Sequence, residues 1–357
     1  MLGLVAVLGE FPTDQLLRLS GGDSYKANVV KSLKAHRLLR TYYADRQRAY
    51  RLTSRAKALL TADNPERFST ALTGAAETNH IKSEITRRLR LHRIAEATVT
   101  MQNAGVRVFS DEKADVFSPE WEETNQIAVP SFYNSREIKA LGTVFVKIHG
   151  ARSVGVLLTE NQILVAYNLG YSLMKWSYKA EMRTKALMKT ILCRERLPSL
   201  YSSDAMQGLL FGNDMSLATE ILAGENGKQY FLLDGNYEHF YYLTNDRKGE
   251  RLLSLLCREE LRGQLDDILL TDLYETDEGL TIENDAINEN GDPVLLAYDC
   301  DLPRIKRFDT ALRLQKKTGT VICFDFQKDA LCRSCGECVK FQTIDFQKWE
   351  RSFFEPP

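Results

Sequence analysis

This chain of 357 residues lacks several features that would assign it directly to a protein class. No stretch reaches the roughly 18–20 apolar residues that span a bilayer, and the apolar run 1–7 is too short for a signal sequence. Seven cysteines, an odd number scattered over a long chain, do not make a disulfide framework. We therefore expect a cytoplasmic protein that does not enter a membrane.

Several catalytic signatures are missing as well. The sequence has no glycine-rich phosphate loop, no G-x-S-x-G nucleophile turn and no H-E-x-x-H helix. Nothing in the pattern identifies an enzyme, and we expect no cofactor.

The charge of the chain is balanced overall but unevenly distributed. Net charge is −1, from 47 Lys+Arg and 48 Asp+Glu, yet the first 100 residues hold 17 basic and 9 acidic residues. Because the first 100 residues are basic and the rest of the chain is acidic, we expect the amino-terminal module to bind an anionic partner.

Residues 1–62 have the layout of a winged helix-turn-helix. The pattern predicts an apolar helix over 2–11, a second helix over 15–19 that Thr13 and Asp14 begin, and a break at Gly21-Gly22. A third helix starts at Asp23 or Ser24 and runs to residue 39, and a hairpin over 38–53 has a polar tip at 44–48.

The third helix and the hairpin are rich in side chains that contact base edges and phosphates. From Ser24 to Lys57 there are ten basic residues and one acid, Asp45. The candidate DNA-binding residues are Ser24, Tyr25, Lys26, Asn28, Lys31, Lys34, Arg46, Arg48 and Arg51. Winged helices also serve as protein-interaction modules or scaffolds, so that alternative stays open.

The phrase "LKAHRLLR…YRLTSRAKALL" resembles the corresponding segment of bacterial winged-helix regulators. The matching residues are Leu33, Leu38, Tyr50, Leu52, Thr53 and Leu59. Arg37 and Ala56 stand where glycines are usual in those proteins.

Residues 63–104 are expected to connect two domains. The polar stretch 61–79 predicts a loose link, and a helix from His80 carries Ile85, Leu89 and His92 on one side with arginines on the others. Such a helix would extend the DNA contact, pair with its copy in a homodimer, or pack on the next domain with solvated arginines.

Strands and helices alternate from residue 105, which predicts an α/β fold with divisions at 105–200 and 201–357. The expected strands include 105–109, 126–130, a hairpin over 153–170, and 230–236. The phrase Asp325-Phe326-Gln327-Lys328 recurs at 345–348, each time where a strand should pass into a helix.

This order of elements, over residues 1 to about 190, resembles the replication-relaxation family of bacterial plasmids and integrative conjugative elements. The resemblance implies an accessory role in replication, relaxation or conjugative transfer, with double-stranded DNA and a relaxase or other transfer protein as partners. It also implies a second domain similar to a restriction-endonuclease core. The hairpin positions that carry metal-binding acids in such a core, at 152–153 and 166–168, hold no carboxylate here, which predicts an inactive domain.

Two other segments were candidate sites of chemistry. Four thiols are close in sequence, and they could bind zinc or an iron–sulfur cluster: Cys323, Cys332, Cys335 and Cys338. A ferredoxin-type run needs cysteine at 342, which is Gln342, so we expect no metal. Segment 272–292 has eight acids and no Lys or Arg, and it is expected to be a solvated loop that competes with DNA for the basic module.

Two alternatives to DNA binding follow from the same sequence. A nuclease or other hydrolase would need several acids to converge in the folded chain; the candidates are Asp299, Asp301, Asp325 and Glu181. A pure interaction module would bind no nucleic acid. Two carboxylates meeting in one cleft would favour the enzyme.

Overall fold

A computed structural model describes residues 1–73, 84–118, 120–121, 127–141, 150–224, 227, 230–275 and 281–354. The chain forms two compact units, Met1–Asn168 with Arg183–Ala205, and Leu169–Met182 with Met206–Pro357. Within the described ranges, no helix is long and apolar enough to cross a membrane.

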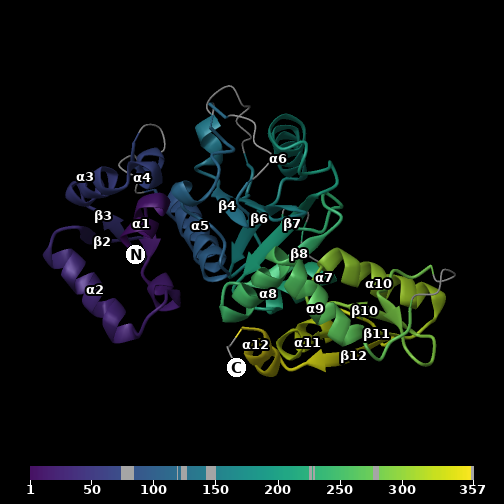
Figure 1. Cartoon of the computed structure of the whole chain (residues 1–357). Coiled ribbons are helices and arrows are strands. Elements are labelled where there is room, and N and C mark those ends of the chain that lie inside the picture. The colour runs from purple at the N-terminus through teal and green to yellow at the C-terminus, as the bar shows by residue number, and fades with distance from the viewer. Residues whose placement is uncertain are drawn as a thin grey trace. The chain divides into compact units, whose positions relative to one another are not determined.

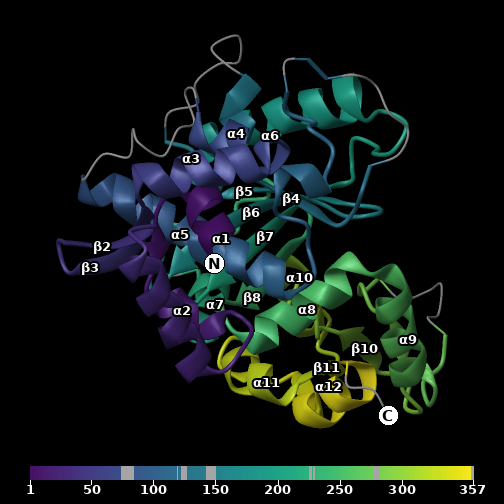
Figure 2. The ribbon, with the colours of Figure 1, turned by 60° about the vertical axis from the view of Figure 1, so that its left-hand side comes forward.

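The first unit begins with the element order of a winged helix, as the sequence predicts (Figure 1). The elements are α1 (Leu2–Leu8), β1 (Phe11–Pro12), η1 (Asp14–Arg18), α2 (Asp23–Ala35), β2 (Leu39–Ala44) and β3 (Gln47–Leu52). The strands form an antiparallel sheet in the order β1-β3-β2. The hairpin β2–β3, the wing, extends outward from the rest of the module in Figure 2.

Apolar residues from all parts of the module form its core. Val5, Phe11, Val30, Leu39 and Leu52 are buried, which brings α1 and α2 onto the sheet. The second helix differs from the prediction, because η1 is a 3-10 turn without a side-chain cap.

The predicted loose link at 61–79 is wrong for the described part of that stretch. Helices α3 (Ser54–Asp63) and α4 (Pro65–Leu72) occupy it, and Asn64 caps α4 by accepting the Arg67 amide at 2.9 Å. Residues 74–83, which include His80, lie outside the described residues. Helix α5 (Ile85–Asn103) follows and lies between the winged helix and β4 (Ser131–Asn134) in Figure 1.

The rest of the first unit contains an antiparallel ladder. Strand β4 pairs with β5 (Gly155–Leu158), and β5 pairs with β6 (Ile163–Gly170), which confirms the predicted hairpin. The strands predicted at 105–109 and 126–130 are wrong for the described residues, which exclude 126, since those residues form only one bridge, Arg107 to Ser131. The described residues up to 196 also form η4 (Ser110–Glu112), η5 (Ile138–Leu141), α6 (Tyr178–Lys189) and η6 (Thr190–Arg196).

The second unit alternates strands and helices, and the α/β class is confirmed. Its elements are β7 (Met206–Gly212), α7 (Ser216–Ala223), β8 (Phe240–Thr244), α8 (Arg247–Cys257), α9 (Glu259–Leu270), β9 (Ala286–Ile287), β10 (Pro293–Leu296), α10 (Leu302–Gln315), β11 (Gly319–Phe324), α11 (Asp325–Cys332), β12 (Val339–Ile344) and α12 (Phe346–Phe354). The strand predicted at 230–236 is wrong: its described residues contribute one bridge, Lys175 to Tyr230.

Parallel pairing dominates this unit. Strand β7 pairs with β8 in parallel. Strands β10, β11 and β12 form a second parallel ladder, and β9 pairs antiparallel with β10 at its edge. The repeated phrase lies at the two predicted junctions, between β11 and α11 and between β12 and α12. Phe326 and Phe346, one from each copy, pack edge to face with ring centroids 5.3 Å apart.

Candidate nucleic-acid interface

Helix α2 has one exposed polar stripe. Ser24, Asn28 and Lys31 are exposed at spacings of four and three residues, so they share a face of the helix. Tyr25 lies beside them with 68% of its surface exposed. These four candidates are therefore open to a partner, and Asn28 has the side chain that can pair with an adenine edge.

The prediction that Lys26 contacts DNA is wrong, because its side chain is buried and not on the outer face of α2. Its ammonium group donates to the carbonyl oxygens of Leu17 at 2.9 Å and Leu19 at 3.3 Å, and it forms an ion pair with Asp23 at 2.9 Å. Lys26 thus ties α2 to the end of η1, where backbone carbonyls need donors. It is not available to DNA.

The wing adds a basic and aromatic face next to α2. Tyr43 pairs with Arg48 across the hairpin, and Thr41 pairs with Tyr50. The two pairs are two residues apart along each strand, so all four side chains lie on the same face of the hairpin. The Lys34 ammonium lies over the Tyr50 ring, 5.3 Å from its centroid, which identifies this face as the one toward α2. Tyr43 is 66% exposed, and Arg48 is exposed too.

Tyr43 is a candidate that the sequence analysis missed. Its signal was available, because an exposed aromatic two residues from a hairpin tip, opposite an arginine, is a surface on which a sugar or base can stack. Arg46 is exposed at the tip itself. The structure thus brings Lys34, Tyr43, Arg46 and Arg48 into one region of the module.

The prediction that Arg51 contacts DNA is also wrong, since this side chain is buried on the opposite face of the hairpin. Its Nε donates to Glu10 at 2.7 Å, and its guanidinium stacks 3.6 Å from the centroid of the Tyr42 ring. The strand alternation that exposes Arg48 directs Arg51 inward, so Arg51 stabilises the module and does not reach a ligand.

Glu10 is the centre of a buried ionic cluster. Beside Arg51, its carboxylate accepts hydrogen bonds from Arg88 Nε at 2.9 Å and His92 Nε2 at 2.8 Å, both from α5. Burial alone would raise the pKa of Glu10, but the hydrogen bonds from His92, Arg88 and Arg51 outweigh it and lower the pKa to about 2. Glu10 is therefore a carboxylate at neutral pH.

Arg88 also holds the wing. Its Nη1 donates to the carbonyl oxygen of Ala44 at 2.6 Å and its Nη2 to that of Gln47 at 3.0 Å, the two residues that flank the tip. One of the alternatives for this helix was a packed helix with solvated arginines, yet Arg88 is fully buried. It fixes the wing to the connecting helix.

The corrected interface keeps a strong charge bias. Of the ten basic residues between 24 and 57, Lys26 and Arg51 are buried, and six are exposed: Lys31, Arg37, Arg40, Arg46, Arg48 and Arg55. The one acid in that stretch, Asp45, is at the wing tip. An exposed surface with this composition attracts a polyanion.

One of the hairpin positions compared with a nuclease core, Asn168, has a structural role. Asn168, where a catalytic acid would be expected, is buried and donates through Nδ2 to the Arg93 carbonyl and to Glu96 Oε2, both at 2.9 Å. The side chain therefore anchors the end of β6 to α5.

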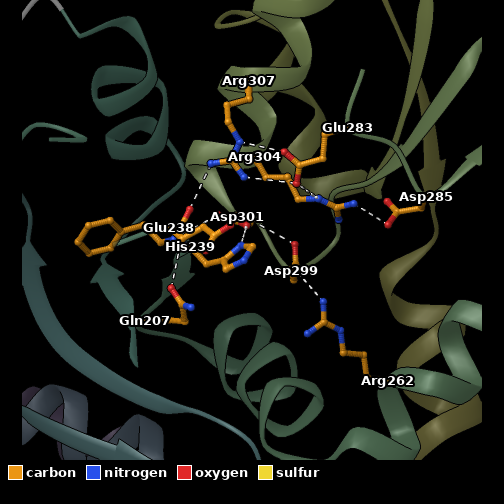
Figure 3. Close-up of polar contacts among 11 residues, drawn as sticks. Gln207, Glu238, His239, Arg262, Glu283, Asp285, Asp299, Asp301, Arg304 and Arg307 are labelled. Atoms are coloured by element: carbon orange, nitrogen blue, oxygen red, sulfur yellow. Dashed lines mark hydrogen bonds and ion pairs between the residues drawn. The ribbon is translucent and has the colours of Figure 1, made fainter. Parts of the chain in front are cut away.

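Asp299 and Asp301 do come together, in the second unit (Figure 3). Asp301 accepts from His239 Nδ1 at 2.6 Å and from the Phe240 amide at 3.1 Å, so it ties the start of β8 instead of capping α10 with its side chain. The Asp299 carboxylate pairs with Arg262 at 3.1 Å. Burial raises the pKa of Asp299 to about 6 although Arg262 opposes the shift, and the bond to Asp301 raises the pKa of His239.

This cluster consists of matched ion pairs. Arg304 and Arg307 bind Glu283, and Arg304 also binds Asp285 at 2.6 Å (Figure 3). A neighbouring groove of about 490 Å³ is lined by Arg307 of this cluster together with residues such as Glu238 and Leu314, and neither Asp299 nor Asp301 lines it. Of the other two acids, Asp325 is exposed at the start of α11, and Glu181 is buried in α6. In the cluster of Figure 3, Asp299, Asp301, Glu283 and Asp285 are each paired with a basic side chain.

The cysteines are free thiols. Cys323 is buried in β11, Cys332 is exposed at the end of α11, and Cys335 and Cys338 are partly exposed. Across the ranges that the structure describes, no three His, Cys, Asp or Glu side chains are grouped to hold a metal ion. Of the acidic segment, residues 276–280 lie outside those ranges.

Comparison of the chain with protein-family models, curated proteins and solved structures finds no match. The candidate interface therefore depends on the contacts, exposure and charge described above.

Proposed function

We propose that the chain binds double-stranded DNA through helix α2 and the β2–β3 wing, with contacts that include bases. The observation that carries the proposal is the exposure of Lys31, Arg46 and Arg48, with Asn28, on one module whose surface between residues 24 and 57 has a single acid. Arginine and lysine at such positions neutralise phosphates, and asparagine on the exposed helix face can read a base edge.

The fixed wing supports the same proposal. A hairpin tip that carries phosphate contacts binds more tightly when its position is set before the ligand arrives, because less conformational entropy is lost. Arg88 supplies that restraint from α5. The resemblance to the replication-relaxation family extends the proposal to an accessory protein of a mobile genetic element in the cytoplasm, acting with a relaxase or other transfer protein and able to form a homodimer.

The test uses the full chain and a short duplex of mixed sequence. Binding should weaken steeply between about 50 and 200 mM salt, because each phosphate contact releases counterions. The double variant Arg46→Ala, Arg48→Ala should lose roughly tenfold in affinity, and its salt slope should flatten by about two units, one per contact.

The matched control removes two exposed cations from the second unit. Lys328→Ala with Arg333→Ala, both on or next to α11, should leave affinity and salt slope unchanged. If the wild-type chain shows no salt-dependent binding to duplex DNA, the proposal is wrong. If both double variants weaken binding equally, the wing has no special part in it.

A further inference from the structure

Two arginines of the winged helix have a left-handed backbone. The φ angle is 55° at Arg37 and 60° at Arg46. Glycine adopts this region readily, whereas a β-carbon makes it unfavourable, so a residue with a long side chain there is uncommon.

Arg37 occupies the position after α2 that glycine normally fills. The Leu38 amide donates to the Leu33 carbonyl at 2.9 Å, and the Arg37 amide donates to the Lys34 carbonyl at 3.0 Å, which is the Schellman arrangement of a helix end. Thr53 Oγ1 donates to the Arg37 carbonyl at 2.6 Å. All three bonds use main-chain atoms of Arg37 and Leu38, so glycine at 37 would keep them.

Arg46 occupies the second position of a two-residue hairpin turn. Ala44 pairs with Gln47, and both Asp45 (φ 53°) and Arg46 are left-handed between them. In this turn type asparagine or aspartate is favoured first and glycine second. Asp45 fits the preference and Arg46 does not.

The side chains of these two arginines make no visible contribution to the fold. Both are exposed, and across the described ranges neither has a carboxylate partner. Strained backbone positions are enriched at functional sites, so the strain gains weight here from the exposed basic surface around both arginines. Both arginines lie on the module that carries the exposed basic surface, one at the joint between α2 and the wing and one at the wing tip.

We propose that Arg37 and Arg46 both contact the phosphate backbone of duplex DNA, and that arginine is retained at two positions where glycine would give the more stable fold. The proposal rests on the DNA-binding role and adds Arg37, at the carboxyl end of α2, to its contact surface. Phosphate contacts there would extend the footprint from the exposed face of α2 to the wing.

The experiment replaces each arginine by glycine in the full chain. Arg37→Gly and Arg46→Gly should each raise the thermal unfolding midpoint of the first unit by about 1–3 °C, because the backbone strain is relieved. Each should also weaken binding to a mixed-sequence duplex by roughly three- to tenfold and flatten the salt slope by about one unit. Arg37→Lys and Arg46→Lys, which keep the charge, should bind within about twofold of wild type.

A matched control exists at the end of α10. Lys316 is exposed with φ 52°, and the amides of Lys316 and Lys317 donate to the Arg313 and Leu312 carbonyls at 3.3 and 3.1 Å, the same motif as at Arg37. Lys316→Gly should stabilise the second unit and leave DNA binding unchanged.

The outcomes separate the two proposals. A wild-type chain that does not bind duplex DNA contradicts the DNA-binding role, and this inference with it. Wild-type binding combined with unchanged affinity and salt slope in either glycine variant overturns the inference alone. So does a loss of stability in the glycine variants, which would show that the arginines support the fold, or equal weakening by Lys316→Gly, which would reduce the effect to net charge.

Discussion

Arg88 and Glu10 form a fully buried ion pair, 2.8 Å apart, which joins the connecting helix α5 to the segment between α1 and β1. The same guanidinium binds the two carbonyl oxygens beside the wing tip. One side chain therefore links the α1–β1 segment, the wing and α5. This makes α5 part of the winged-helix module and not a linker that follows it.

Arg88→Ala should lower the free energy of unfolding of the first unit by about 3–5 kcal/mol, because it leaves Glu10 short of a partner and frees the Ala44 and Gln47 carbonyls. Chemical denaturation followed by far-UV circular dichroism measures the change. The neighbouring Arg87, whose pair with Glu84 is about half exposed on both sides, is the control. Arg87→Ala should change stability by less than about 0.5 kcal/mol, and equal losses in the two variants would contradict the role assigned to Arg88.

The low pKa of Glu10 predicts acid sensitivity of the first unit. Because the folded pKa of about 2 lies below the usual 4.5, the stabilisation is complete above pH 4.5 and is lost as the pH falls toward 2, by roughly 3 kcal/mol. Arg51, Arg88 and His92 face this carboxylate. In Glu10→Gln this pH dependence should disappear, and denaturation at pH 5 and pH ~2.5 compares the two chains. A constant difference between them over that range would show that Glu10 titrates normally.

Asp299 predicts the opposite slope in the second unit. Its folded pKa of about 6 lies above the usual 3.8, so the folded state binds the proton more tightly, and the second unit should lose roughly 3 kcal/mol as the pH rises from about 4 to 6. The raised pKa of His239 acts in the same direction: its contribution is present below pH 6.5 and is lost above it. Asp299→Asn should flatten the first of these changes. If thermal scans of this variant and wild type fall in parallel from pH 4 to 6, another group is responsible.

The local pattern was enough to predict the winged helix, the hairpin β5–β6 and the two strand-to-helix junctions at the repeated phrase. These elements combine an apolar periodicity with clear turn residues. The link at 61–72 was predicted wrongly although Asn64-Pro65 is a standard start of a helix, a cap followed by proline at the first helical position. The strands expected at 105–109 and 230–236 fail because alternation alone does not supply a pairing partner.

The interior charges could not be assigned from sequence. Lys26 lies four residues before Val30 and so shares the buried face of α2. The sequence does not show where its charge goes: the flexible stem brings the ammonium to the carbonyls of η1. Arg88 lies three residues after Ile85 and four before His92, on the same side of α5, but this spacing does not identify its partner. Its burial depends on Glu10, far away in the chain, and such a pairing is visible only when the fold is known.

Two side chains of α2, Asn28 and Lys31, should have different parts in DNA binding: Asn28 recognises bases and Lys31 binds phosphate. Asn28 is exposed on the same stripe as Lys31, and an asparagine amide can make two hydrogen bonds to adenine, whereas a lysine at this position adds charge. In a selection from a random duplex library, Asn28→Ala should lose preference at one or two positions of the wild-type motif while its salt slope stays unchanged. Lys31→Ala should keep the motif and flatten the slope by about one unit, since it removes one counterion-releasing contact. Neither exposed side chain supports the core, so the unfolding midpoints should stay close to wild type. Selection of the same motif by Asn28→Ala and wild type would place base recognition elsewhere, with the exposed Tyr43 and Arg48 face of the wing as the next surface to test.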